Sequence, residues 1–246
     1  MTFNCLTIFP ELFSSMACGL TAKALEQKLI ALNVIDFRTY TQDKHGRVDD
    51  YPFSGGPGML LMPQPLFDCF DDLKDREKGR VRRIYMSPAG SLFTQSTARR
   101  LTENYDTLTI LCGRYEGVDQ RVLDTCIDEE ISIGDYVLSG GEVPAMVVMD
   151  ACMRLLPGFM GNEASLSSES HSDGLLEYPQ YTRPSEFRGL RVPDILLSGD
   201  HRRIENWKHE EALRKTLKNR PDLLEKRTLT PEERESIQRI KEETSE

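Results

Sequence analysis

The chain has 246 residues, 39% of them hydrophobic, which fits one large domain or two modest ones and allows a real core. No apolar run approaches the roughly 18 residues of a membrane span, and no basic secretory leader opens the chain, so we expect a cytoplasmic protein without membrane contact. The net charge of -9 argues against indiscriminate binding of nucleic-acid backbones by the body of the protein.

Short apolar runs rich in β-branched residues alternate with helical patterns along the first two thirds of the chain. Five strands are predicted, at 3–9, 34–37, 81–86, 107–112 and 127–133. Helical patterns, with apolar residues three and four apart, occupy 20–30, 64–73 and 94–104, and a long apolar helix follows at 142–156. This alternation predicts an α/β fold with a mainly parallel sheet covered on both faces.

The composition changes after Pro157. Residues 161–174 are polar, serine-rich and without periodicity, which predicts a flexible linker. Beyond it, one helix is expected from about Asp200 to the residue before Pro221, and another begins with Thr230 as its cap and Glu233 closing a capping box. We therefore expect an α/β domain over 1–160, the linker over 161–174 and a small all-helical domain over 175–246.

Six cysteines are scattered without a CxxC pair, mostly among apolar residues, so we expect buried free thiols and neither disulfides nor a zinc site.

Charge is unevenly distributed along the chain. Residues 201–227 contain nine Lys and Arg against five Asp and Glu, and a second basic run covers 74–83. Taken alone, each basic run is most simply a solvated helix face. It supports a nucleic-acid-binding surface only if other features point independently to a nucleic-acid substrate.

Three predicted strands are followed by unusual loops, "YMSPAG" at 85–90, "CGRYEGVDQR" at 112–121 and "SIGDYVLSGGEVPA" at 132–145. Ligands of open α/β sheets bind at the carboxyl ends of strands, and glycine lets a ligand approach the backbone. The third loop has no Lys or Arg and matches no phosphate-binding sequence motif. Such loops offer backbone amides and carbonyls to an adenine edge, a ribose and an amino-acid tail, which suits S-adenosylmethionine.

Four stretches, "GGPGM", "CGRYEGVDQR", "EEISIGDYVLSGGE" and "PQYTRP", closely resemble the bacterial tRNA (guanine-N(1))-methyltransferases of the TrmD type. The resemblance runs from "FPELF" to "RPDLLE" and covers nearly the whole chain. It implies a SPOUT-like α/β fold with a trefoil-knotted cofactor site and an obligate homodimer. It also implies methyl transfer from S-adenosylmethionine to N1 of the guanine just 3′ of a tRNA anticodon, where a guanine precedes it.

The resemblance assigns roles to particular residues. Glu169, where the family usually has aspartate, would be the general base, with His171 and Asp173 as alternatives, and Arg154 would stabilise charge on the guanine oxygen. The cofactor would be held by Ser87, Pro88, Gly113, Tyr115, Glu116, Ser132, Ile133, Gly134, Asp135, Tyr136, Val137, Leu138, Gly140 and Gly141. RNA would be bound by Asp50, Arg183, Arg202, Arg203 and Lys208.

Alternatives stay open at this point. Glu116 and Asp135 would equally serve as loop-stabilising acceptors of nearby amides, and Tyr178 and Tyr181 would stack on splayed bases or pack on their own domain. A related knotted enzyme would methylate a ribose 2′-hydroxyl instead, and a third alternative is a non-catalytic RNA-binding protein. No metal-binding residues are predicted, and a requirement for Mg²⁺ in the reaction is left open.

Overall fold

The computed structural model describes residues 1–53, 55–161 and 169–245, and of residues 244 and 245 the backbone alone. The chain forms two compact units, Met1–Gly161 and Asn162–Glu246. Each unit has its own hydrophobic core and is described by itself. The α/β elements belong to the first unit.

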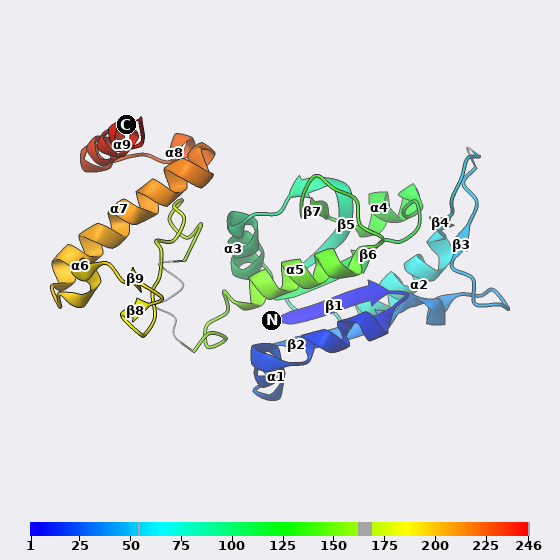
Figure 1. Ribbon diagram of the computed structural model, residues 1–246. Helices are drawn as coiled ribbons and strands as arrows, with labels where there is room; N and C mark the ends of the chain where they lie inside the picture. Colours follow the sequence, from blue (N-terminus) through cyan, green and yellow to red (C-terminus); the bar gives the residue numbers. More distant parts are fainter. Residues whose placement is uncertain (54, 162–168, 246) are drawn as a thin grey trace. The chain divides into compact units, whose positions relative to one another are not determined.

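A five-stranded parallel sheet forms the centre of the first unit, as the alternating pattern predicts (Figure 1). Its order is β2-β1-β6-β5-β7. The strands are β1 (Thr2–Thr7), β2 (Ala31–Asp36), β5 (Val81–Leu92), β6 (Thr107–Cys112) and β7 (Glu129–Ser132). β1 sits between two neighbours, so Cys5 pairs with Val34 on one side and Ile110 on the other. β2 begins before its expected start at Val34 because Ala31, Leu32 and Asn33 also pair with β1.

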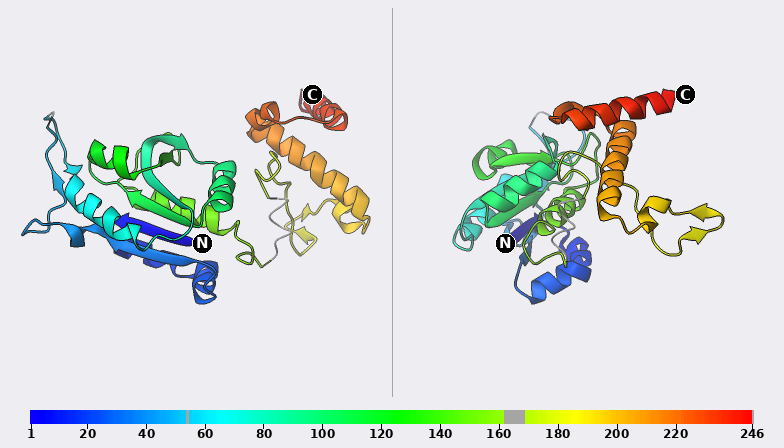
Figure 2. Two further views of the ribbon diagram at one scale, coloured as in Figure 1. Left: turned by 180° about the vertical axis from the view of Figure 1, so that it is seen from behind. Right: turned by 90° about the vertical axis from the view of Figure 1, so that its left-hand side faces the viewer.

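Helices cover both faces of this sheet, as the three views of Figures 1 and 2 show. One face carries η1 (Pro10–Met16), α1 (Gly19–Glu26), α3 (Gln95–Asn104) and α5 (Glu142–Met153). The other carries η2 (Phe37–Tyr40), α2 (Pro63–Lys74) and α4 (Gln120–Cys126). A short antiparallel hairpin of β3 (Asp49–Asp50) and β4 (Leu60–Leu61) leaves the sheet between η2 and α2.

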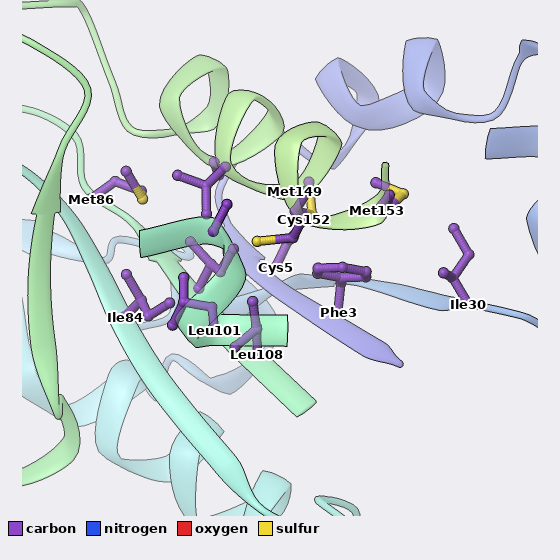
Figure 3. Packing of buried hydrophobic residues seen from close by; sticks show 14 of the residues in the cluster. Phe3, Cys5, Ile30, Ile84, Met86, Leu101, Leu108, Met149, Cys152 and Met153 are labelled. Atoms are coloured by element: carbon purple, nitrogen blue, oxygen red, sulfur yellow. The ribbon is translucent and has the colours of Figure 1, made fainter. Parts of the chain in front are cut away.

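Successive side chains of β1 alternate between the two cores. Phe3 and Cys5 pack beneath α5, where Met149, Cys152 and Met153 point toward the strand (Figure 3). Leu6 belongs to the core on the opposite face. This two-sided burial is typical of a parallel sheet covered by helices on both faces.

All six cysteines are free, as expected, and five are buried, but Cys18 is exposed. Cys18 precedes α1 at the surface, where its Sγ donates to the carbonyl of Ser15. Burial raises the pKa of the Cys152 thiol to about 12, and that of Cys69 to about 12, so neither is a nucleophile at neutral pH.

The second unit contains α6 (Asp194–Leu197), α7 (His201–Asn219), α8 (Pro221–Lys226) and α9 (Pro231–Ser245). The helix starts are confirmed: the Asp200 side chain accepts from the amide of Arg203, and Thr230 and Glu233 exchange the two hydrogen bonds of a capping box. Leu213, Leu224 and Ile240 lie at the centre of its core.

An all-helical prediction misses one feature of this unit, a hairpin of β8 (Glu186–Phe187) and β9 (Leu190–Arg191). Its turn residues, Arg188 and Gly189, have φ values of 52° and 77°, the positive pair that a tight hairpin turn requires. Of the predicted linker, residues 162–168 lie outside the described part of the chain. The rest makes a turn in which the His171 amide donates to the carbonyl of Leu175, a core residue.

Candidate functional site

A cavity of about 280 Å³ lies in the first unit, beside a break within β5 and at the carboxyl ends of β6 and β7. Its walls come from this break and from the loops that follow β6 and β7. The carboxyl edge of a parallel sheet is the usual place for a ligand, since neighbouring strands deliver their loops to one point. The β3–β4 hairpin joins the same region, because the amide of Glu116 donates to the carbonyl of Met59 at 3.0 Å.

The first wall is a break within β5. β5 pairs with β7 up to Met86 and resumes at Ser91, so Ser87 to Gly90 leave the ladder between them. Ser87 is buried, and its hydroxyl accepts a hydrogen bond from the amide of Ala89 at 3.2 Å. This break turns backbone groups and Pro88 toward the cavity.

The second wall follows β6. A Cβ on Gly113 would lie 2.6 Å from the hydroxyl of Tyr85, so this position has no room for a side chain. Two residues on, Tyr115 has a φ of 59°, a left-handed conformation that costs a residue other than glycine on the order of 1 kcal/mol. Such strain at a cavity wall is typical of functional loops.

The third wall is the loop between β7 and α5. Its end lies against the second wall, because the amide of Gly141 donates to the carbonyl of Gly113 at 2.9 Å. A Cβ on Gly141 would stand 2.8 Å from both the Cα of Cys112 and the nitrogen of Gly113. The two loops are therefore in direct backbone contact, which only glycine permits at this point.

A buried ion pair stands behind this contact. Arg114 Nη2 lies 2.8 Å from Oε2 of Glu142, the first residue of α5, and the Glu142 side chain is 1% exposed. Glu142 Oε1 accepts from the hydroxyl of Thr7 at 2.8 Å. The guanidinium of Arg114 stacks on the ring of Phe9 at 4.5 Å and donates to the carbonyl of Ser139. This network links the end of β1 to both loops.

The structure brings together every residue predicted to hold a cofactor except Asp135, which does not border the cavity. Asp135 lies in the same loop, between two residues that do. The further lining residues, which the prediction left out, are Tyr85, Met86, Arg114, Gly117, Ile131, Ser139 and Pro144. Six of them stand inside the loop motifs that the sequence singles out, and Ile131 directly precedes the third loop, so the sequence carried a signal for these positions.

The two predicted catalytic residues belong to different units. Arg154 caps the C-terminus of α5 in the first unit and is half-buried. Glu169 belongs to the second unit, where it borders a cavity of about 220 Å³ together with Tyr178, Lys208 and His209. Its carbonyl accepts from the amide of Ser172 at 3.1 Å, which places it in a folded turn.

The predicted RNA-binding residues are mostly exposed. Asp50 ends β3, and Arg183 precedes Pro184 in an irregular segment. Arg202 and Arg203 stand in the first turn of α7, and both are exposed. Lys208 differs, because it is half-buried, pairs with Glu205 at 2.7 Å and lies 5.2 Å from the ring centre of Tyr178. Its charge is already partly satisfied within the unit.

The described residues contain neither a membrane-spanning helix nor a cluster of metal ligands. Residues 1–53, 55–161 and 169–245 contain no helix that is both long and apolar enough to cross a membrane. The same part of the chain has no group of three or more His, Cys, Asp or Glu side chains that would hold a metal ion.

Comparison with known proteins gives the family. The model of the family described as "tRNA (Guanine-1)-methyltransferase TrmD" matches residues 1–226. A tRNA (guanine-N(1)-)-methyltransferase of Bacillus cereus strain AH820 is 48% identical over 98% of this chain and 99% of its own length. Relatives of the same name from Bacillus anthracis strain CDC 684 and Bacillus thuringiensis subsp. konkukian have the same identity and coverage. The chain belongs to the TrmD family.

Membership of the TrmD family confirms the resemblance that the loop motifs carry. It does not favour the ribose 2′-hydroxyl methyltransferase, because the relatives bear the name of a base methyltransferase. Nor does it favour a non-catalytic RNA-binding protein, since the match extends over both units of the chain and the relatives are named as enzymes.

Proposed function

We propose that this protein transfers a methyl group from S-adenosylmethionine to N1 of the guanine just 3′ of the anticodon in tRNAs that carry a guanine before it. The observation that carries the proposal is the meeting of three glycine-bearing loops around one cavity in a member of the TrmD family. The backbone contact between Gly113 and Gly141 is the point at which we propose the trefoil knot of a SPOUT fold. A tRNA substrate implies a cytoplasmic enzyme.

The residues around the cavity fit this cofactor. Glycines without room for a Cβ let an adenine edge and a ribose approach the backbone of the wall closely, and Tyr115 and Tyr136 offer ring faces. When bound, S-adenosylmethionine supplies an electrophilic methyl group on a sulfonium. Among the described residues, no Lys lines the cavity, and the charge of the one Arg that does is paired with Glu142. The wall therefore does not repel a cation.

The chemistry needs a base, because N1 of guanine carries a proton and attacks well only as that proton leaves. We assign this role to Glu169, whose carboxylate would take the N1 proton while N1 bonds to the methyl carbon and the bond from that carbon to sulfur breaks. Arg154 would stabilise the negative charge that develops on the guanine oxygen. Methylation measured during titration with a chelator tests whether the reaction requires Mg²⁺.

RNA recognition would use exposed charges of both units. Asp50 would accept hydrogen bonds from the guanine that precedes the target, since a carboxylate reads base donors. Arg183, Arg202 and Arg203 would meet phosphates, which position an RNA without reading its sequence. Lys208 is the weakest of these assignments because Glu205 already pairs with it.

We further propose a homodimer. Exposed apolar side chains gather on η1, α5 and the loop that enters α5, namely Leu12, Val137, Val143 and Val147. η1 and α5 pack side by side, since the hydroxyl of Ser15 lies 3.8 Å from the sulfur of Met146. Exposed apolar side chains on elements that pack together are typical of an interface between subunits. We call these four residues the apolar strip.

The proposed function is tested with one tRNA transcript and labelled cofactor, followed by mass mapping of the product. We expect one added methyl on the guanine 3′ of the anticodon. A matched transcript with adenine in place of the preceding guanine should react about 5- to 150-fold more slowly, because one lost base contact costs about 1–3 kcal/mol. Equal rates on the two transcripts would refute the proposed recognition of guanine.

A further inference from the structure

Arg114 is the only Lys or Arg among the residues that line the cofactor cavity in the described part of the chain. A cationic cofactor and a guanidinium share one cavity wall, which is unfavourable unless the guanidinium is neutralised. Its neutralising partner is Glu142, 2.8 Å away and 1% exposed. Among the described residues, no other carboxylate lies within ion-pair distance of Arg114.

A helix N-terminus, a hydroxyl donor and a guanidinium surround the carboxylate of Glu142. Glu142 is the first residue of α5, and a helix N-terminus favours negative charge. The hydroxyl of Thr7 donates to Oε1 at 2.8 Å, and Arg114 stands at Oε2. Because the carboxylate is buried, solvent screens its field weakly, and its charge acts on the neighbouring cavity.

We propose that Glu142 is a specificity-determining residue that, by neutralising Arg114, lets the cavity hold the cationic methyl donor as well as its neutral product. This inference rests on the proposed use of S-adenosylmethionine. The donor carries a positive sulfonium, and the product S-adenosylhomocysteine has an uncharged thioether in its place. The two ligands are otherwise alike, so the difference in their affinities reports the charge of the wall.

The test is Glu142→Gln in the full-length protein, with S-adenosylmethionine and S-adenosylhomocysteine titrated separately by calorimetry. Glutamine keeps the size and the acceptor for Thr7 but leaves Arg114 uncompensated. Two unit charges about 12 Å apart change an affinity about tenfold at an effective dielectric constant of about 20, and closer charges change it more. We expect the affinity for the donor to fall about tenfold more than the affinity for the product.

Two further variants separate charge from structure. Arg114→Gln leaves Glu142 unpaired and should shift the ratio of the two affinities in the opposite direction, toward the donor. Thr7→Val removes a hydrogen bond of the same network without changing charge, so it should leave the ratio unchanged. The double variant Glu142→Gln with Arg114→Gln restores a neutral pair and should return the ratio to the wild-type value.

Equal loss of both affinities in Glu142→Gln would overturn the inference, because it would show that Glu142 only supports the loops. If that variant does not fold, Arg114→Gln decides alone, and an unchanged ratio there overturns the inference equally. Glu116 also borders the cavity, but it is present in every variant and cancels from the comparison. Wild-type protein that binds neither ligand would instead refute the proposed function.

Discussion

Glu169 is the carboxylate that we propose as the general base. If this carboxylate takes the guanine proton, Glu169→Gln removes the base and preserves the size of the side chain. We expect the single-turnover rate of methylation to fall about a hundredfold or more, with little change in the affinity for S-adenosylmethionine. Rapid quench with saturating tRNA and cofactor measures the first, and calorimetry the second.

Two neighbouring substitutions serve as controls for this assignment. Glu169→Asp should retain partial activity, although a displacement of about 1 Å costs rate by itself. His171→Phe should be nearly neutral, provided that its melting temperature is unchanged, since His171 has a φ of 70° that the new residue must share. A near wild-type rate in Glu169→Gln together with a collapse in His171→Phe would identify the histidine as the base.

Gly141 is the residue at which the two cofactor loops touch. In Gly141→Ala, the new Cβ meets the Cα of Cys112 and the nitrogen of Gly113 at 2.8 Å, and neither backbone atom is free to move aside. We expect a loss of about 2 kcal/mol in the free energy of unfolding and strongly weakened binding of S-adenosylmethionine. Thermal unfolding and calorimetry measure the two effects.

Gly161 offers a matched control for that substitution, because nothing lies within 4 Å of a Cβ built there and its φ is not positive. Gly161→Ala should therefore leave both stability and cofactor affinity unchanged. Wild-type affinity and melting temperature in Gly141→Ala would show that the loops separate easily and that their backbone contact is not required.

At the scale of the secondary-structure element, local signals predicted well. The alternation of apolar runs and helical patterns predicted the parallel sheet. The capping box of Thr230 and Glu233 predicted the start of α9. The end of β5 could not be predicted from local sequence signals. Its last residues continue the strand only because β7 pairs with them after a break, and this partner lies far along the chain.

The same division applies to the cofactor cavity. Positions inside each loop could be assigned because motif and resemblance point to them residue by residue. The ion pair of Arg114 and Glu142 could not, since the two stand in different loops and only the folded contact brings their charges together. No spacing rule connects Thr7 to either of them. The β8–β9 turn is a different case, because its Arg-Gly pair is a weak form of a known turn signal.

The capping box of α9 gives a prediction that depends on pH. Glu233 is buried, which raises its pKa, but the Thr230 amide and Arg227 outweigh this and hold the pKa below its usual value of 4.5. A lowered pKa stabilises the fold above pH 4.5, and the contribution is lost as the pH falls through the folded value. Glu233→Gln should therefore cost about 1.5 kcal/mol at neutral pH and progressively less below 4.5.

The measurement for this prediction is simple, because the protein has a single tryptophan, Trp207, and it lies in α7 of the second unit. Its fluorescence during urea unfolding follows the unit that contains Glu233. Asp222→Asn is the control, since that carboxylate pairs with Arg220 at an exposed site, where ion pairs contribute little. A cost of Glu233→Gln that stays constant with pH would contradict the assignment of the effect to the carboxylate charge.

At the scale of the whole molecule, the apolar strip predicts self-association. We expect a sedimentation mass near twice that of one 28.1 kDa chain. Val147→Glu places a charge in the strip and should shift the protein toward the monomer, with loss of methylation if the active site needs both subunits. Leu197→Glu, an equally exposed apolar position outside the strip, should leave the mass unchanged. A monomeric mass in fully active wild-type protein would refute the dimer.

The residues that line the cofactor cavity all fall between Tyr85 and Pro144, an uninterrupted stretch of the chain. Translation runs from the N-terminus, so the ribosome completes every wall of this cavity before it reaches Glu169. The residues of the methyl donor's pocket thus precede the proposed proton acceptor in the order of synthesis.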